Sequence, residues 1–205
     1  MANPFPKNPP PTLTVYWKGV ITDTATGKVV RKTRKYRARS FHNVFLQLAT
    51  RYMFGASAPN VIDIDGNTRN PATFLQPVHT STVSGHGFET EGIVCGTSSA
   101  AVDAGDYYLT AVITDGTGSG QLSYGNNTTS TGSVATGSSI TSFDVTRPIA
   151  NSSGGTITVE EIGLVMSISI TAVVRGFMYL RDLTGGVDVG DGQTLTVTYT
   201  ITTTA

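Results

Sequence analysis

Residues 146–170 read Thr-Arg-Pro-Ile-Ala-Asn-Ser-Ser-Gly-Gly-Thr-Ile-Thr-Val-Glu-Glu-Ile-Gly-Leu-Val-Met-Ser-Ile-Ser-Ile and contain the longest strand-like run of this 205-residue chain. The alternation of apolar residues in this run shifts by one position between two groups, namely Ile157 and Val159, then Ile162, Leu164, Met166, Ile168 and Ile170. Such a shift would turn every later side chain to the opposite face of a sheet unless a β-bulge absorbs it. We therefore predict a long central strand over residues 156–170 with a bulge at Glu160-Glu161.

Further strand-like segments occur at regular spacing on both sides of this run. After residue 90 they span residues 91–96, 107–114, 121–124, 139–147, 173–180 and 194–203, and turn clusters separate them. Near the N-terminus, residues 13–22 and 29–39 form a predicted hairpin. A chain of this length with such spacing suits one all-β domain, so we predict an antiparallel, jelly-roll-like β-sandwich over residues 13–205.

One segment departs from the strand pattern. Its apolar residues recur at helical spacing, at Phe41, Val44, Phe45, Leu48 and Tyr52. Ser40 precedes them as a predicted N-cap, and Gly55 follows them as a helix-ending glycine. We predict an amphipathic α-helix over residues 41–54 whose apolar face packs on a sheet.

Residues 1–12 contain five of the nine prolines of the chain. Proline fixes φ and lacks the amide donor, so this density excludes a helix or a central strand and predicts an extended, polyproline-like N-terminal arm. Such an arm is either a frayed chain end or a segment that docks on a neighbour. Phe5 is the candidate anchor for docking, because it is the aromatic side chain within the arm.

The formal net charge of zero conceals an asymmetry along the chain. Residues 1–54 carry a net charge of +9, and the remaining residues carry −9. Parts of opposite charge attract each other within one subunit or, head to tail, between subunits.

The positive charge is concentrated in residues 31–39. Six cations occur there, at Arg31, Lys32, Arg34, Lys35, Arg37 and Arg39. If the segment is one strand, Lys32 and Arg34 lie on one face and the other four cations on the opposite face. Charge on both faces suits an edge strand that is protected from aggregation or that meets an acidic partner surface. Contact with nucleic-acid phosphates is the less favoured alternative, because no base-reading module accompanies the cations.

No motif in the sequence predicts catalysis or a cofactor. Asp63-Ile64-Asp65-Gly66-Asn67 alternates oxygen ligands before a glycine, but it lacks the spacing of an EF-hand calcium loop. His79 and His86 have no metal-binding pattern around them, and the single cysteine, Cys95, is predicted to be a buried strand residue. We therefore expect no enzyme, no cofactor and no metal site.

The sequence also bears on where the protein acts. Its first residues lack the basic and apolar regions of a signal peptide, and no apolar run reaches the length of a membrane span. We therefore expect synthesis in the cytoplasm and no membrane association.

Six turn-and-strand segments within residues 90–200 are distinctive: Gly92-Ile93-Val94-Cys95-Gly96-Thr97, Asp106-Tyr107-Tyr108-Leu109, Gly120-Gln121-Leu122-Ser123-Tyr124, residues 147–164, Leu180-Arg181-Asp182, and Gly192-Gln193-Thr194-Leu195-Thr196-Val197-Thr198-Tyr199-Thr200. Together they resemble a group of phage and prophage virion structural proteins. The resemblance implies a capsid, decoration or tail component that is present in many copies, with copies of itself and other virion proteins as partners. It implies no catalytic residue.

The sequence leads to one favoured function and two alternatives. The favoured one is a self-assembling structural protein of the virion, made in the host cytoplasm. The first alternative is a carbohydrate-binding or adhesin module with a site in loops such as residues 60–73. The second is a subunit of an extracellular filament joined by strand exchange.

Overall fold

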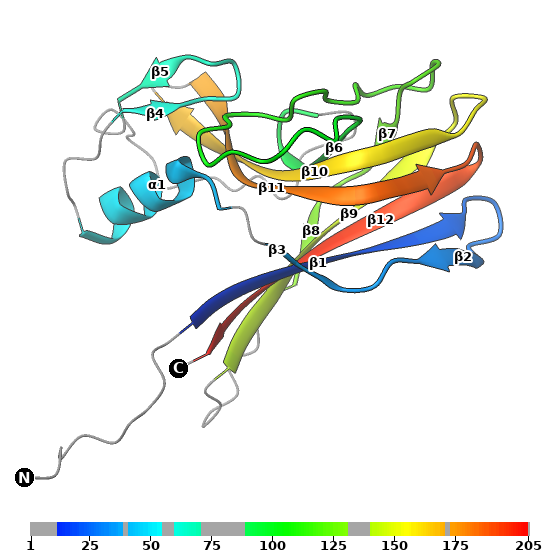
Figure 1. Ribbon diagram of the computed structural model, residues 1–205, viewed down its shortest axis with the longest axis horizontal. Helices are drawn as coiled ribbons and strands as arrows, with labels where there is room; N and C mark the ends of the chain where they lie inside the picture. The colour runs from blue at the N-terminus through cyan, green and yellow to red at the C-terminus, as the bar shows by residue number, and fades with distance from the viewer. Residues whose placement is uncertain are drawn as a thin grey trace, which may run out of the picture.

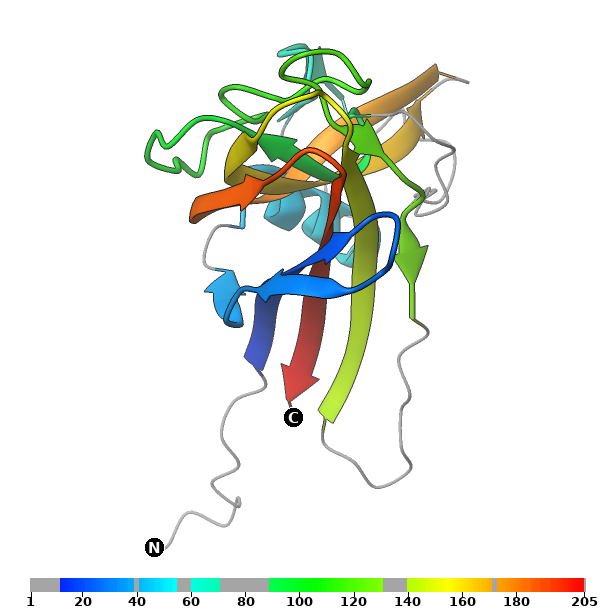
Figure 2. The same cartoon turned by 90° about the vertical axis from the view of Figure 1, so that its right-hand side faces the viewer.

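The chain folds into two antiparallel β-sheets that face each other, as the computed structural model shows (Figures 1 and 2). The structure describes residues 12–38, 41–54, 60–70, 89–130, 140–170 and 173–204. Strands make up most of these residues, so the prediction of an all-β, sandwich-like fold is confirmed.

The first sheet, which we call the large sheet, has seven strands. They are β1 (Thr12–Asp23), β2 (Val29–Lys32), β3 (Tyr36–Ala38), β7 (Ser123–Tyr124), β8 (Thr128–Thr129), β9 (Ile140–Asn151) and β12 (Gln193–Thr204). The order is β2-β1-β12-β9-β7, with β3 also paired to β1 and β8 to β9. Its long strands β1, β12 and β9 pair over almost their whole length, so that Thr12 lies opposite Thr204.

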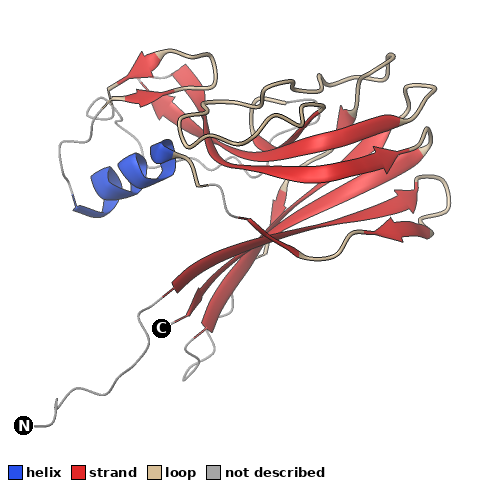
Figure 3. Ribbon diagram, viewed as in Figure 1, coloured by secondary structure: helices blue, strands red, loops and turns tan. Residues whose placement is uncertain are grey.

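The second sheet has three strands in the order β11-β10-β6, which are β11 (Val173–Val189), β10 (Ile157–Ile170) and β6 (Gly92–Gly96). A separate two-stranded ribbon consists of β4 (Val61–Ile62) and β5 (Thr68–Arg69). Within the described residues the helix α1 (Asn43–Phe54) is the only one, and it lies beside the three-stranded sheet (Figure 3). It is too short to cross a membrane.

Strand β10 is the central strand of the three-stranded sheet, and its pairing with β11 is irregular at the place where the bulge was predicted. The register shifts between Val159 and Glu161, where the single residue Glu160 faces residues 184–186 of β11, so the extra residues belong to β11 and not to β10. Ile157 and Val159 before the bulge, and Ile162 after it, are therefore buried in the same core. The predicted irregularity at Glu160-Glu161 is thus confirmed, and both parts of the strand stay on the core, but the additional residues that produce it lie on the neighbouring strand β11.

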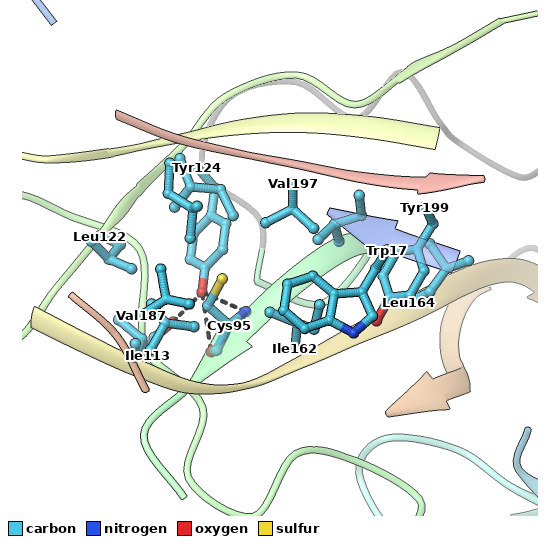
Figure 4. Close-up of a cluster of buried hydrophobic side chains, with 14 of the residues drawn as sticks. Trp17, Cys95, Ile113, Leu122, Tyr124, Ile162, Leu164, Val187, Val197 and Tyr199 are labelled. Carbon is cyan, nitrogen blue, oxygen red and sulfur yellow. Dashed lines mark hydrogen bonds between the residues drawn. The ribbon is translucent and has the colours of Figure 1, made fainter. Parts of the chain in front are cut away.

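The main core lies between the two sheets (Figure 4). Trp17 of β1 and Leu195, Val197 and Tyr199 of β12 face inward, so the strand predicted over residues 194–203 is confirmed and has one buried face. Cys95 is fully buried in β6, as predicted, and burial raises the pKa of its thiol to about 12. The Cys95 thiol is therefore an unreactive core group at neutral pH.

The helix packs as predicted but begins later. Val44 and Leu48 contact Ile168 and Phe177 of the three-stranded sheet, which confirms the core-facing apolar side. The helix begins at Asn43, two residues after the predicted start at Phe41, and the predicted N-cap Ser40 lies outside the described residues. Phe41 instead forms a β-bridge with Leu180, so the chain is still extended there. Gly55, the predicted end of the helix, lies outside the described residues.

Two predicted strands have different bounds. Residues 107–114 form a loop with one isolated bridge, from Val112 to Gly96, instead of a strand, because the Ala111 amide donates to the Glu161 carboxylate rather than to a strand neighbour. Strand β11 does not end at residue 180 but continues to Val189, through Gly185 and Gly186, which both have positive φ. The two glycines read as a turn in sequence, yet they lie within the strand.

The buried His42 side chain should make the stability of the fold depend on pH. The side chain is buried, and burial lowers the pKa of its imidazole below 6.5, only partly offset by the Ala104 carbonyl and by Asp106. The unfolded state therefore binds a proton first as the pH falls below about 6.5. We expect the free energy of unfolding to fall from there down to the folded-state pKa. In a His42→Leu variant, denaturant titrations at several pH values should show a weaker fall; an unchanged pH dependence would contradict this role.

Candidate functional site

The cations predicted as an interaction surface lie at one edge of the large sheet. We call Arg31, Lys32, Arg34, Lys35 and Arg37 the basic edge; all five side chains are exposed. Strand β2 stands at one end of the strand order of the large sheet, so the prediction of an edge position is confirmed. Arg39, the sixth cation, lies outside the described residues.

The basic edge is not one regular strand, and its predicted face assignment is wrong. Residues 33–35 separate β2 from β3, and one more residue stands in this segment than in the facing part of β1. As a result Arg31 lies opposite Ile21, on the core-side face, whereas Arg37 lies opposite Tyr16, on the outer face. The irregularity thus places Arg31 and Arg37, which were predicted to share a face, on opposite faces of the sheet.

Local contacts hold the basic edge in place. The Gly19 amide donates to the Thr33 hydroxyl at 2.8 Å, and the Thr33 amide donates to the Gly19 carbonyl at 2.9 Å. Tyr36 stacks on the buried Trp17 with ring centroids 4.6 Å apart, and Arg34 lies 5.3 Å from the Tyr36 ring. The Lys35 ammonium lies 4.2 Å from the Tyr16 ring. The cations are thus partly pre-ordered, which lowers the entropy cost of binding a partner.

The basic edge has no acidic partner within the described part of its own chain. The ion pairs found there join other arginines, namely Arg69, Arg175 and Arg181, to carboxylates. The attraction between the oppositely charged parts of the chain is therefore not satisfied by ion pairs of the basic edge within the described subunit.

Some carboxylates in the acidic part of the chain are already paired with arginine. Glu161 and Asp106 each accept from Arg181 at 2.7 Å, and Glu161 is fully buried. Asp103, Asp188 and Asp191 are exposed and Glu160 is half-buried. These four carboxylates, which we call the acidic group, are accessible at the surface.

Arg181 and Glu161 form a buried network with a structural role. Besides the two carboxylates, the Arg181 guanidinium donates to the Ala100 carbonyl at 3.1 Å and to the Thr110 hydroxyl at 3.0 Å. Glu161 accepts from the Ala111 amide at 2.9 Å. The network fastens residues 100–111 to the three-stranded sheet.

The suggested calcium loop is occupied by internal contacts. The buried Asp63 carboxylate accepts from the Asn67 amide at 2.8 Å and from Arg69 at 2.6 Å, and Asp65 pairs with Arg175 at 3.6 Å. Within the described ranges, no group of three or more His, Cys, Asp or Glu residues is arranged to hold a metal ion. His79 and His86 lie outside those ranges.

A second surface, which sequence reasoning missed, is an apolar groove. One end of the large sheet extends beyond the three-stranded sheet, so the two layers part there (Figure 1). The groove between them has a volume of about 480 Å³ and is bordered by α1. It is lined by Leu13, Phe41, Phe45, Gly92, Thr129, Phe143, Val145, Leu164, Val165, Met166, Ser167, Tyr179, Leu180, Ile201 and Thr203. Because these residues come from many separate segments, no pattern in the sequence predicts the groove.

The third surface is a polar recess on the outer face of the large sheet, over β9 and β12. It has a volume of about 620 Å³, and its lining includes Ser123, Asn126, Thr128, Thr146 and Thr196. Trp17, the single tryptophan, is buried on the opposite face and is not available to stack on a sugar.

The predicted anchor Phe5 lies outside the described residues, and strand β1 begins at Thr12. The structure thus gives a basic edge, an acidic group and an apolar groove on the described part of one subunit. Comparison with known proteins adds no identity to this geometry: no family model matches the chain, and no curated protein or solved structure matches it.

Proposed function

We propose that this protein is a virion structural protein that self-assembles in many copies and has no catalytic role. The observation that carries the proposal is the basic edge, whose pre-ordered cations have no acidic partner within the described subunit. The resemblance to phage structural proteins and the acidic group on the same subunit support it. Each copy then offers both charges that the contact needs.

The charges act together in this proposal. An exposed ion pair contributes only about 0–1 kcal/mol. An assembly of many copies repeats the same contact at every interface, so small contributions from several cations add up. The purified protein should then form rings, tubes or shells that negative-stain microscopy detects.

Neutralising several cations of the basic edge should weaken assembly. We expect the triple variant Arg34→Gln, Lys35→Gln, Arg37→Gln to assemble less than the wild type and with a smaller dependence on salt, because screened charge pairs are removed. Light scattering across a salt series measures both effects. A single Lys28→Gln change, in the turn before β2, is the control and should be nearly silent.

The same variant separates a protein partner from a nucleic-acid partner. If the basic edge binds phosphates, the triple variant assembles normally but loses DNA retention in filter binding, with a salt slope reduced by about one unit per lost phosphate contact. If neither assembly nor DNA retention changes, the basic edge is only a protected sheet edge, and the proposal loses its main support.

A carbohydrate-binding module remains the second candidate, favoured by the hydroxyl-lined polar recess. Hydroxyl and amide groups match the hydrogen-bonding groups of sugars. The burial of Trp17 weakens this candidate, because exposed aromatic rings supply the stacking surface in many sugar sites. A glycan-array screen without a signal above background would remove it.

A further inference from the structure

The apolar groove has aromatic rings on both of its walls. Phe41 and Phe45 lie with ring centroids 4.8 Å apart, and Phe45 meets Tyr179 edge to face at 5.5 Å. On the large sheet, Leu13 and Phe143 line the groove and are each 41% exposed. A surface of this kind on an isolated subunit is typical of a binding site for another segment.

The chain itself contains a segment of matching chemistry. Aromatic-lined grooves bind proline-rich segments, because the polyproline helix is preformed and loses little entropy when its rings dock. Residues 4–11 hold five prolines and Phe5. We propose that the groove of one copy binds residues 4–11 of a neighbouring copy, with the Phe5 side chain between the aromatic rings. This inference rests on the self-assembly proposed above.

The geometry of the chain favours a neighbour over the same subunit. The arm joins the domain at Thr12, and the next residue, Leu13, already lines the groove. A polyproline segment rises about 3.1 Å per residue, which puts Phe5 roughly 22 Å from Thr12. To reach its own groove the chain would have to reverse within residues 5–12, where Pro9-Pro10-Pro11 disfavours a tight turn and no glycine is present.

Disulfide trapping in full-length protein tests the contact. Copies carrying Lys7→Cys, which keeps Phe5 and the prolines, are mixed with tagged copies carrying Thr203→Cys, a residue that lines the groove. Cys95 does not interfere, because it is fully buried and its thiol pKa is raised to about 12. We expect a cross-linked heterodimer of intermediate mobility on non-reducing gels. The matched control replaces Thr203→Cys with Val174→Cys, an exposed site outside the groove lining, and should give at least tenfold less product.

A double variant, Lys7→Cys with Thr203→Cys, distinguishes the possible outcomes. Docking in a neighbour gives a ladder of linked copies, whereas docking in the same subunit gives a closed monomer and overturns the proposal. Sedimentation of the same samples shows whether the copies assemble at all, independently of the arm contact. Assembly without a heterodimer above the Val174→Cys control rejects only the arm contact, whereas a monomer without cross-links rejects both the contact and the proposed self-assembly.

Discussion

An Arg181→Met variant should lose about 3–5 kcal/mol of unfolding free energy, because it leaves a buried carboxylate without its cation. Arg181 and Glu161 are both fully buried, and the guanidinium lies 2.7 Å from each of two carboxylates. A domain of this size has a total stability of about 5–15 kcal/mol. The substitution therefore removes a large fraction of it, and denaturant titration followed by tryptophan fluorescence measures the loss.

Arg175 is a matched control on the same strand. It also pairs with a carboxylate, but at 3.6 Å and with side chains that are 32% and 60% exposed. An Arg175→Met variant should therefore change the unfolding free energy by only about 0–1 kcal/mol. Equal effects of the two substitutions would contradict the role assigned to the buried network.

The second large effect is expected at Arg147, which ties the two sheets together. From β9 its guanidinium donates to the Gly125 carbonyl at 2.8 Å, to the Glu91 carbonyl at 2.8 Å and to the Ile93 carbonyl of β6 at 2.9 Å. It also lies 4.7 Å from the Tyr124 ring. An Arg147→Met variant keeps an apolar chain of similar length but removes every donor. Each buried acceptor left unsatisfied costs about 1–3 kcal/mol, so for these three acceptors we expect a total loss of at least about 3 kcal/mol.

Hydrogen exchange identifies the site of this loss. The amides of β6 should exchange faster in Arg147→Met than in the wild type, because β6 loses its tie to the large sheet. In an Arg147→Lys variant the exchange rates of the β6 amides should lie between those of the wild type and of Arg147→Met. Lysine keeps the positive charge but cannot donate to several acceptors at once as the guanidinium does. Wild-type stability and exchange in Arg147→Met would show that Arg147 does not join the sheets.

The strands that sequence reasoning located best are those with one buried face. In β12 and β10 the period-two pattern is present in the sequence, and the irregular pairing of β10 with β11 at Glu160 is visible as a phase shift. The helix face was likewise readable from its spacing. In each case the local pattern and the tertiary contact favour the same structure.

The errors arose where distant residues override the local pattern. Residues 107–114 alternate like a strand, but Glu161, about 50 positions later, accepts the Ala111 amide hydrogen bond and holds the segment as a loop. The basic edge reads as one strand, but the anchoring of Thr33 to Gly19 interrupts it. Sequence spacing carries no record of either contact.

The basic edge and the apolar groove also differ in how far the sequence reveals them. The cations of the basic edge are adjacent in sequence, so their clustering was readable before the fold was known. The apolar groove combines side chains from both sheets and the start of α1. Only the folded chain brings those side chains together.

Sedimentation velocity of the purified full-length protein tests the central claim, self-assembly, most directly. The monomer has a mass of 21.5 kDa. We expect the average sedimentation coefficient to rise above the monomer value as concentration increases, and to rise further at low salt, where the opposite charges of neighbouring copies are least screened. A single 21.5 kDa species at every concentration, at low and at high salt, would contradict the claim.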